Sequence, residues 1–335
     1  MTSPKSLLFG LLLLTHGSLG WGKTELLNVS YDPTRELYQA VNPLFEAQWA
    51  REGHGEVSIS QSHGASAKQA QSVVDGLKAD VVSLALAPDL DALVKAKLVQ
   101  EHWQDQLPYH SAPYTSTVVL LVRKGNPKQI RDWNDLIRAD VGVVTANPKT
   151  SGGSRWGYLA AWGYALRSQG LNQEGARLFV KSIFDRVVAL DAGSRAATQS
   201  FVDKGLGDVL ITWENEAYSI LKKDPQSGFE IVTPSLSILA EPVVAVVDAV
   251  VDVKGSRQLA TEYLRFLYSE PAQEVIAQNY FRPRNVDVAQ KYEHIFKPIV
   301  LFSIDEVFGG WTQVQATHFS EGGILDKILE DRQMN

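Results

Sequence analysis

The chain has 335 residues, which is enough for about two domains of ordinary size, each with its own core. Hydrophobic residues make up 44% and charged residues 21%, which is typical of a soluble folded protein and excludes a disordered or fibrous chain. The net charge of -6 argues against nucleic acid or an anionic membrane as a partner, and the absence of cysteine excludes disulfides, thiolate metal sites and cysteine nucleophiles.

Residues 1–22 have the features of a secretory signal peptide. Lys5 supplies a positive flank, an apolar run follows from Leu7 to Leu14, and small residues between Ser18 and Gly22 suit a signal peptidase. The apolar run is too short to span a membrane, which takes about 20 apolar residues. We therefore predict an exported, periplasmic protein.

Short β-branched runs alternate with helical patterns along the rest of the chain. Six runs predict strands that are followed by helices, at 26–30, 57–60, 81–86, 141–145, 187–190 and 209–213. Two further runs, 117–123 and 242–247, lack such a helix and are predicted to cross between two lobes. This order indicates an α/β protein with a ligand cleft between its lobes. We assign 23–116 and about 248–335 to the first lobe, and about 117–247 to the second.

Four of the predicted helices begin with small, hydroxyl-bearing or glycine residues. The turns are Tyr31-Asp32-Pro33, with Asp32 as the expected N-cap, and the segments 61–66, 147–154 and 191–194. The start of a helix exposes unpaired backbone N–H groups and carries about half a positive charge, so it suits an anion. Each turn alone is typical of an ordinary capped helix, but four such turns together favour an anion site in the cleft.

The sequence contains no recognisable catalytic motif. It has no nucleophile elbow, no zinc-binding H-E-x-x-H, no phosphate-binding loop and no dinucleotide fingerprint. His54 and His63 flank one strand, where histidines more often have surface or supporting roles than bind metal. Glu214 and Glu216 are typical of acids at a helix start, and Trp213 before them is by itself typical of a core residue. We predict neither an enzyme nor a cofactor or metal site.

Several longer motifs resemble one known family. They are Asn28 to Leu37, Gln61 to Gly64, Ser111 to Thr117, Ser151 to Gly153, Gly207 to Glu216 and Asp305 to Trp311. Over nearly the whole mature chain these segments closely resemble the periplasmic sulfate-binding proteins, the substrate-capturing subunits of sulfate/thiosulfate ABC importers. The resemblance implies a two-lobed periplasmic binding protein fold of type II. It also implies a monomer that encloses sulfate and delivers it to membrane permease subunits.

The resemblance further implies how the dianion is held: by backbone N–H groups, serine hydroxyls and one indole N–H, without a counter-charge. The matching residues are Asp32 (backbone N–H), Ser66, Ser151, Gly152, Gly153, Ser194 (backbone N–H) and Trp213, with His63 and Arg195 in supporting positions. This chain departs from the family pattern at Ala65 and Ala67, which replace glycines, and at Ser194, which replaces the usual alanine. The two alanines require a negative backbone φ.

Two alternatives remain open from the sequence. The first is a binding protein for another tetrahedral oxyanion, such as phosphate, molybdate or thiosulfate. Protonated phosphate needs an acceptor, which Asp32 would supply if its carboxylate faced the cleft. The second is an exported hydrolase or transferase acting on sulfate or phosphate esters, for which the sequence offers no recognisable nucleophile–base pair.

Overall fold

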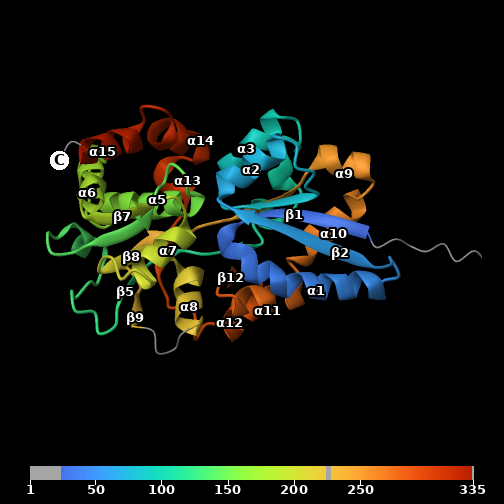
Figure 1. Cartoon of the computed structure of the whole chain (residues 1–335), viewed down its shortest axis with the longest axis horizontal. Helices are drawn as coiled ribbons and strands as arrows, with labels where there is room; N and C mark the ends of the chain where they lie inside the picture. Colours follow the sequence, from blue (N-terminus) through green and yellow to red (C-terminus); the bar gives the residue numbers. More distant parts are fainter. Residues whose placement is uncertain (1–23, 224–227, 334–335) are drawn as a thin grey trace, which may run out of the picture.

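Two β-sheets form the centres of two lobes that lie side by side in Figure 1. The computed structural model describes residues 24–223 and 228–333, so the predicted signal peptide lies outside the described residues. In spatial order, the first sheet contains β11 (Val243–Val246), β3 (Val81–Leu84), β1 (Thr24–Tyr31) and β2 (Val57–Gly64). The second contains β7 (Val187–Asp191), β6 (Val143–Ala146), β8 (Val209–Trp213), β5 (Val118–Arg123) and β9 (Phe229–Val232). The predicted α/β class is confirmed.

The first sheet carries a hydrophobic core on each face because its strands alternate their side chains. Leu26 of β1 packs in one cluster with α1 (Arg35–Arg51), while Val29 packs in another with α2 (Ser66–Val74). The apolar residues of α1 recur at helical spacing along one buried face. The other helices of this lobe are α3 (Ala87–Lys95), α9 (Asp248–Lys254), α10 (Arg257–Phe266), α11 (Glu270–Gln278) and α12 (Val286–Lys291).

The helix α5 (Gly152–Arg167) packs against the sheet of the second lobe. Most of its residues are buried, including the large rings of Trp156 and Trp162. A helix that is apolar around its whole circumference must be covered on all sides. Its neighbour is α6 (Gln173–Asp185), while α7 (Ser194–Val202) and α8 (Glu214–Lys223) pack on the strands of the same sheet. Since α5 is fixed by this packing, its first residues are held at the boundary between the lobes.

The chain crosses between the lobes next to the two predicted runs, not within them. Runs 117–123 and 242–247 correspond to β5 and β11, which lie inside the two sheets. Just before each of these strands, Ser116 and Ala240 form an antiparallel bridge with two backbone hydrogen bonds of 2.9 Å. The β-branched side chains of both runs are buried in the cores because burial of apolar surface is favourable. The residues before these strands therefore connect the two lobes.

The C-terminal segment lies beside the second lobe. There β13 (Val300–Phe302) pairs with β10 (Leu236–Ile238), and α15 (Ile324–Gln333) contacts α6. In Figure 1, α13 (Ile304–Phe308), α14 (Trp311–Val314) and α15 lie on the side of α5 and α6. The ring of Phe302 fills the space beside Gly163 of α5, where any Cβ would overlap it. These contacts favour placing residues 300–333 in the second lobe, and the division of the chain into lobes stays a prediction.

Candidate functional site

Four helix starts meet around one small cavity at the boundary of the lobes. Two come from the first lobe, where β1 leads into the 3-10 helix Asp32–Thr34 and β2 leads into α2. Two come from the second lobe, where β6 leads to α5 and β7 leads to α7. The cavity, of about 20 Å³, is lined by Tyr31, Asp32, Pro33, Gly64, Ala65, Ser66, Ala85, Ser151, Gly152, Gly153, Gly193 and Ser194. The structure thus brings together six of the seven predicted contact residues, and none of the described lining residues is cationic.

Two of the lining serines are held by backbone groups. Ser66 begins α2, and its Oγ accepts a hydrogen bond of 2.9 Å from the backbone N–H of Ala85. Ser151 is the N-cap of α5, and its Oγ accepts from the N–H of Ser154 at 3.4 Å. Each oxygen accepts from the backbone, so its hydroxyl can still donate; near the Ser66 hydroxyl lies the carboxyl of Asp89, and near the Ser151 hydroxyl lies Ser194 Oγ, at 3.4 Å.

Glycine is required at the start of α5 by close approach. A Cβ at Gly152 would lie 3.2 Å from the Cβ atoms of Ala85 and Ser66, both in the first lobe. A Cβ at Gly153 would lie 3.0 Å from Ser194 Oγ and 3.2 Å from Trp213 Nε1. Gly152 therefore allows the two lobes to meet, and Gly153 leaves room among the polar groups of the site.

Trp213 lies beside the cavity and not in its lining. It ends β8 with 3% of its surface exposed, and its indole Nε1–H donates to the backbone carbonyl of Gly153 at 2.9 Å. Its ring also packs against Tyr31, with 5.8 Å between ring centroids. The indole N–H is thus directed at the start of α5, within the same polar cluster as Gly153 and Ser194.

Asp32 differs in detail from the sequence-based expectation. Tyr31 occupies the N-cap position, and Asp32 is the first residue of the 3-10 helix, followed by Pro33. The Asp32 carboxylate lies 3.4 Å from the guanidinium of Arg35, so it is paired within its own first turn. This pairing disfavours the carboxylate as an acceptor for a protonated ligand, while the backbone of Asp32 still lines the cavity.

The departures at Ala65 and Ala67 are compatible with the observed backbone. Ala65 has φ -61° and ψ 134°, and Ala67 lies inside α2. Both conformations are open to alanine, so the missing glycines cost no backbone strain. The negative backbone φ that these two alanines require is therefore present.

Arg195 joins the two lobes next to the cavity. From α7 it contacts Glu36 of α1 at 2.8 Å and Glu216 of α8 at 3.2 Å, so its charge is paired with acids of both lobes. Burial raises the pKa of Glu36, but hydrogen bonds from Arg195 outweigh it and hold this pKa below its ordinary value. Arg195 is absent from the cavity lining, in agreement with a supporting position.

Glu216 is buried, and its contact with Arg195 is poorly aligned for a hydrogen bond. Its Oε2 lies 3.2 Å from Arg195 Nε, but this N–H makes no aligned hydrogen bond among the described residues. Burial therefore outweighs the attraction of Arg195 and raises the pKa of Glu216 to about 7.

This shift predicts a pH-dependent stability. The folded state holds the Glu216 proton more tightly than the unfolded state, so the contribution is complete below the ordinary value of 4.5 and is lost as pH rises through about 7. The full shift corresponds to about 3 kcal/mol. We expect the free energy of unfolding of wild type, relative to Glu216→Gln, to fall between pH 4 and 8 in urea titrations. Parallel pH profiles for the two proteins would contradict this assignment.

His63 does not line the cavity and instead contacts a side chain of the neighbouring strand. Its Nδ1 lies 2.7 Å from Ser30 Oγ, between the neighbouring strands β2 and β1. Burial, followed by the charge of Arg35, lowers the pKa of His63 to about 4. The imidazole is therefore neutral at pH 7 and supplies no counter-charge to an anion.

Ala85 is the site residue that sequence reasoning missed. Its N–H donates to Ser66 Oγ at 2.9 Å, and its carbonyl accepts from the indole N–H of Trp156 at 2.9 Å. It thereby links α2 of the first lobe to α5 of the second. An alanine that directly follows an apolar strand carries no side-chain signal of such a role, so the sequence alone offers no means of finding it.

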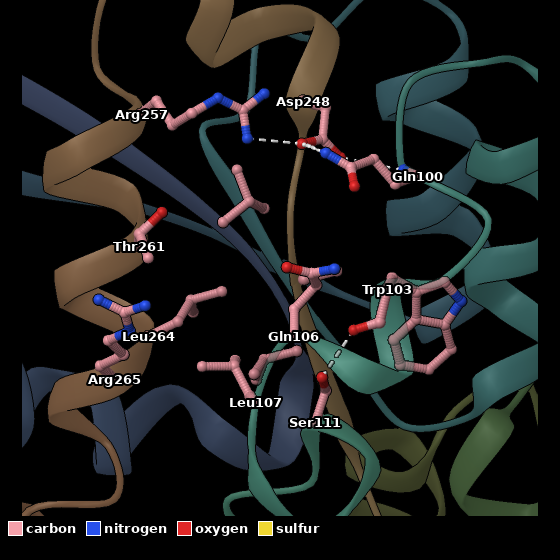
Figure 2. Close-up of a pocket in the computed structure, with 13 residues that line it drawn as sticks. Gln100, Trp103, Gln106, Leu107, Ser111, Asp248, Arg257, Thr261, Leu264 and Arg265 are labelled. Carbon is pink, nitrogen blue, oxygen red and sulfur yellow. Dashed lines mark hydrogen bonds and ion pairs between the residues drawn. The ribbon is translucent and has the colours of Figure 1, made fainter.

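A larger cavity of about 80 Å³ lies within the first lobe, as shown in Figure 2. Its charged side chains have partners nearby: Arg257 contacts Asp248 at 2.7 Å, and Arg265 contacts Glu262 at 2.8 Å. Because these groups satisfy one another, the cavity lacks the converging free donors found at the four helix starts.

Metal binding and membrane spanning have no support in the described part of the chain. Residues 24–223 and 228–333 contain no group of three or more side chains suited to hold a metal ion. In the same ranges, no helix combines the length and apolar character needed to cross a membrane.

Comparisons with known proteins agree with this geometry. A family model described as "Bacterial extracellular solute-binding protein" matches residues 26–282. A sulfate-binding protein of Salmonella typhimurium is 55% identical over 317 residues, covering 95% of this chain and 96% of that protein. A thiosulfate-binding protein of Pseudomonas aeruginosa is 48% identical over 316 residues, covering 94% of this chain and 95% of that protein.

Solved structures agree with the fold. A sulfate-binding protein from Mycobacterium tuberculosis matches with a TM-score of 0.79 and 35% identity, over 88% of this chain and 98% of that one. A periplasmic thiamin binding protein, 19% identical, shares the fold with a TM-score of 0.64 over 85% of this chain and 92% of that one. The expected type II periplasmic binding protein fold is thus confirmed. The chain belongs to the family of bacterial extracellular solute-binding proteins.

Proposed function

We propose that this protein captures inorganic sulfate in the periplasm, as a monomer, and delivers it to the membrane permease subunits of an ABC importer. The observation that carries this proposal is the meeting of four helix starts around one small cavity with no cationic lining residue. Such starts present backbone N–H groups and positive dipole ends, which suit a small anion that offers only acceptors. The volume of about 20 Å³ disfavours an organic substrate.

The similarity to proteins named for sulfate binding supports the choice of ligand. The Salmonella relative carries that name at 55% identity, and so does the Mycobacterium structure at 35%. The family description as extracellular and the predicted signal peptide support a periplasmic location. The relatives are named as binding proteins, which supports a role without catalysis.

Thiosulfate is the second candidate ligand. The Pseudomonas relative, named as a thiosulfate-binding protein, covers nearly the same share of this chain at 48% identity. Thiosulfate is also a tetrahedral dianion without a proton to donate, so it meets the same set of donors.

Calorimetric titration of the desalted mature protein tests the proposal. We expect sulfate to bind most tightly, thiosulfate less tightly, and phosphate and molybdate weakly. Hydrogen phosphate keeps a proton, and a donor facing that proton is left unpaired at a cost of about 1–3 kcal/mol. The pKa of His63 is about 4. Sulfate affinity should therefore show no step near pH 6.5 in wild type, and His63→Gln should have the same pH profile. Tighter binding of phosphate, or turnover of a generic sulfate ester, would contradict the proposed function.

A further inference from the structure

Ser194 differs from the other two serines that line the cavity. The Oγ atoms of Ser66 and Ser151 each accept a hydrogen bond from a backbone N–H. Within the described residues, the one hydrogen-bond partner of Ser194 Oγ is Ser151 Oγ, at 3.4 Å. A good O–H···O bond is about 2.7–2.8 Å long, so this contact is weak. Of the three serines that line the cavity, Ser194 thus has the hydroxyl with the greatest freedom to turn.

The position of Ser194 directs this hydroxyl to the site. Ser194 is the first residue of α7, which has nine residues, and it follows the N-cap Gly193. Its Oγ would lie 3.0 Å from a Cβ on Gly153, so it points across to the start of α5. Ser194 and Gly153 both line the cavity. The side chain therefore stands between two helix starts whose dipoles favour negative charge at the same place.

We propose that the Ser194 hydroxyl is a direct donor to the bound oxyanion, in addition to the backbone N–H of the same residue. The proposal rests on the proposed function and adds one side-chain donor to that site. An oxyanion next to Ser194 offers a charged acceptor in place of the weak contact with Ser151. Charge-assisted hydrogen bonds are shorter and stronger than neutral ones, so the hydroxyl should turn from Ser151 to the anion. The ligand is that of the proposed function, a tetrahedral oxyanion such as sulfate, which presents an oxygen acceptor to this hydroxyl.

Three substitutions at this position separate the hydroxyl from the backbone amide. Ser194→Ala removes only the hydroxyl, and Ser194→Thr keeps one. Ser194→Pro removes the backbone N–H as well. Proline is favoured at the first position of a helix, and Gly193 before it is already extended at φ -156° and ψ 165°, as a residue before proline prefers. Ser200→Ala is the matched control, since Ser200 is a buried serine of α7 outside the cavity lining.

Calorimetric titration of the five mature proteins with sulfate tests the role of Ser194. We expect Ser194→Ala to bind about tenfold more weakly, Ser194→Pro more weakly still, and Ser194→Thr and Ser200→Ala to bind like wild type. Thermal unfolding without ligand checks that each variant is folded. Unchanged affinity of Ser194→Ala, beside a wild type that binds sulfate, would overturn only the role of the hydroxyl. A wild type that bound no sulfate would overturn the proposed function and this proposal with it.

Discussion

Replacing Gly152 with valine should weaken sulfate binding at least about 100-fold. A Cβ at this position already lies 3.2 Å from the Cβ atoms of Ala85 and Ser66 and 3.3 Å from Leu86 Cδ1. All three neighbours belong to the first lobe, whereas Gly152 begins α5 of the second. The Cβ of valine is already crowded there, and we expect its two methyl groups to push the lobes apart. Separation would remove the donors of Ser66 and Asp32 from the anion, and each hydrogen bond to a charged group contributes about 1.5–3 kcal/mol.

The measurement for Gly152→Val combines calorimetry with small-angle scattering. We expect wild type to become more compact when sulfate is added, because contacts from both lobes exist together only in the closed form. The variant should show no such change. The matched control is Gly157→Ala on the same helix, whose Cβ would lie 3.2 Å from Ile211 Cγ2 within the second lobe. If Gly157→Ala lost as much affinity as Gly152→Val, general damage to α5 would explain both, and the steric role of Gly152 would be wrong.

Replacing Trp213 with phenylalanine should weaken sulfate binding by roughly 10- to 150-fold at 25 °C. The indole Nε1–H lies at the start of α5, where it donates to the Gly153 carbonyl at 2.9 Å. We expect this donor to turn to the dianion when sulfate is bound. Phenylalanine keeps most of the apolar body beside Tyr31 but removes the donor, so one acceptor of a buried charged ligand loses its partner.

If the role of Trp213 is purely structural, we expect the opposite result for Trp213→Phe. In that case the N–H serves the Gly153 carbonyl throughout, and Trp213→Phe lowers the melting temperature of the ligand-free protein while sulfate affinity stays nearly unchanged. Our prediction is a modest loss of ligand-free stability, because the ring position remains largely filled. Calorimetry and thermal unfolding of the same variant distinguish the two roles.

The residues at the four helix starts could be predicted because their signal is local. Ser66, Ser151 and Ser194 each stand within a short turn between a strand and a helix, where preferences for small and hydroxyl-bearing residues are set by the orphan N–H groups. The alternation of strands and helices, which places such turns at the same edge of a sheet, also follows from patterns a few residues long. The fold class and the positions of these turns were therefore accessible from the sequence.

The details that depend on distant parts of the chain were not accessible. The pair of Asp32 and Arg35 is local, because both residues lie within one turn. The contact of Arg195 with Glu36, in contrast, joins residues of different lobes. The packing of Phe302 against Gly163 joins two segments of the second lobe that are far apart in the sequence. Such pairs are chosen by the final packing of the two lobes and leave no periodic pattern in either segment.

By itself, the sequence determined an α/β chain whose helix starts are suited to an anion, because turn chemistry and hydrophobic periodicity act over a few residues. The sequence also predicted that these starts face one cleft, but tertiary structure alone decided that a Cβ at Gly152 would crowd Ala85 across the boundary and that Trp213 directs its N–H to Gly153. The reason is that a close approach between lobes depends on how residues far apart in the sequence pack together. Such an approach is a property of the assembled fold, and local preferences contain no information about it.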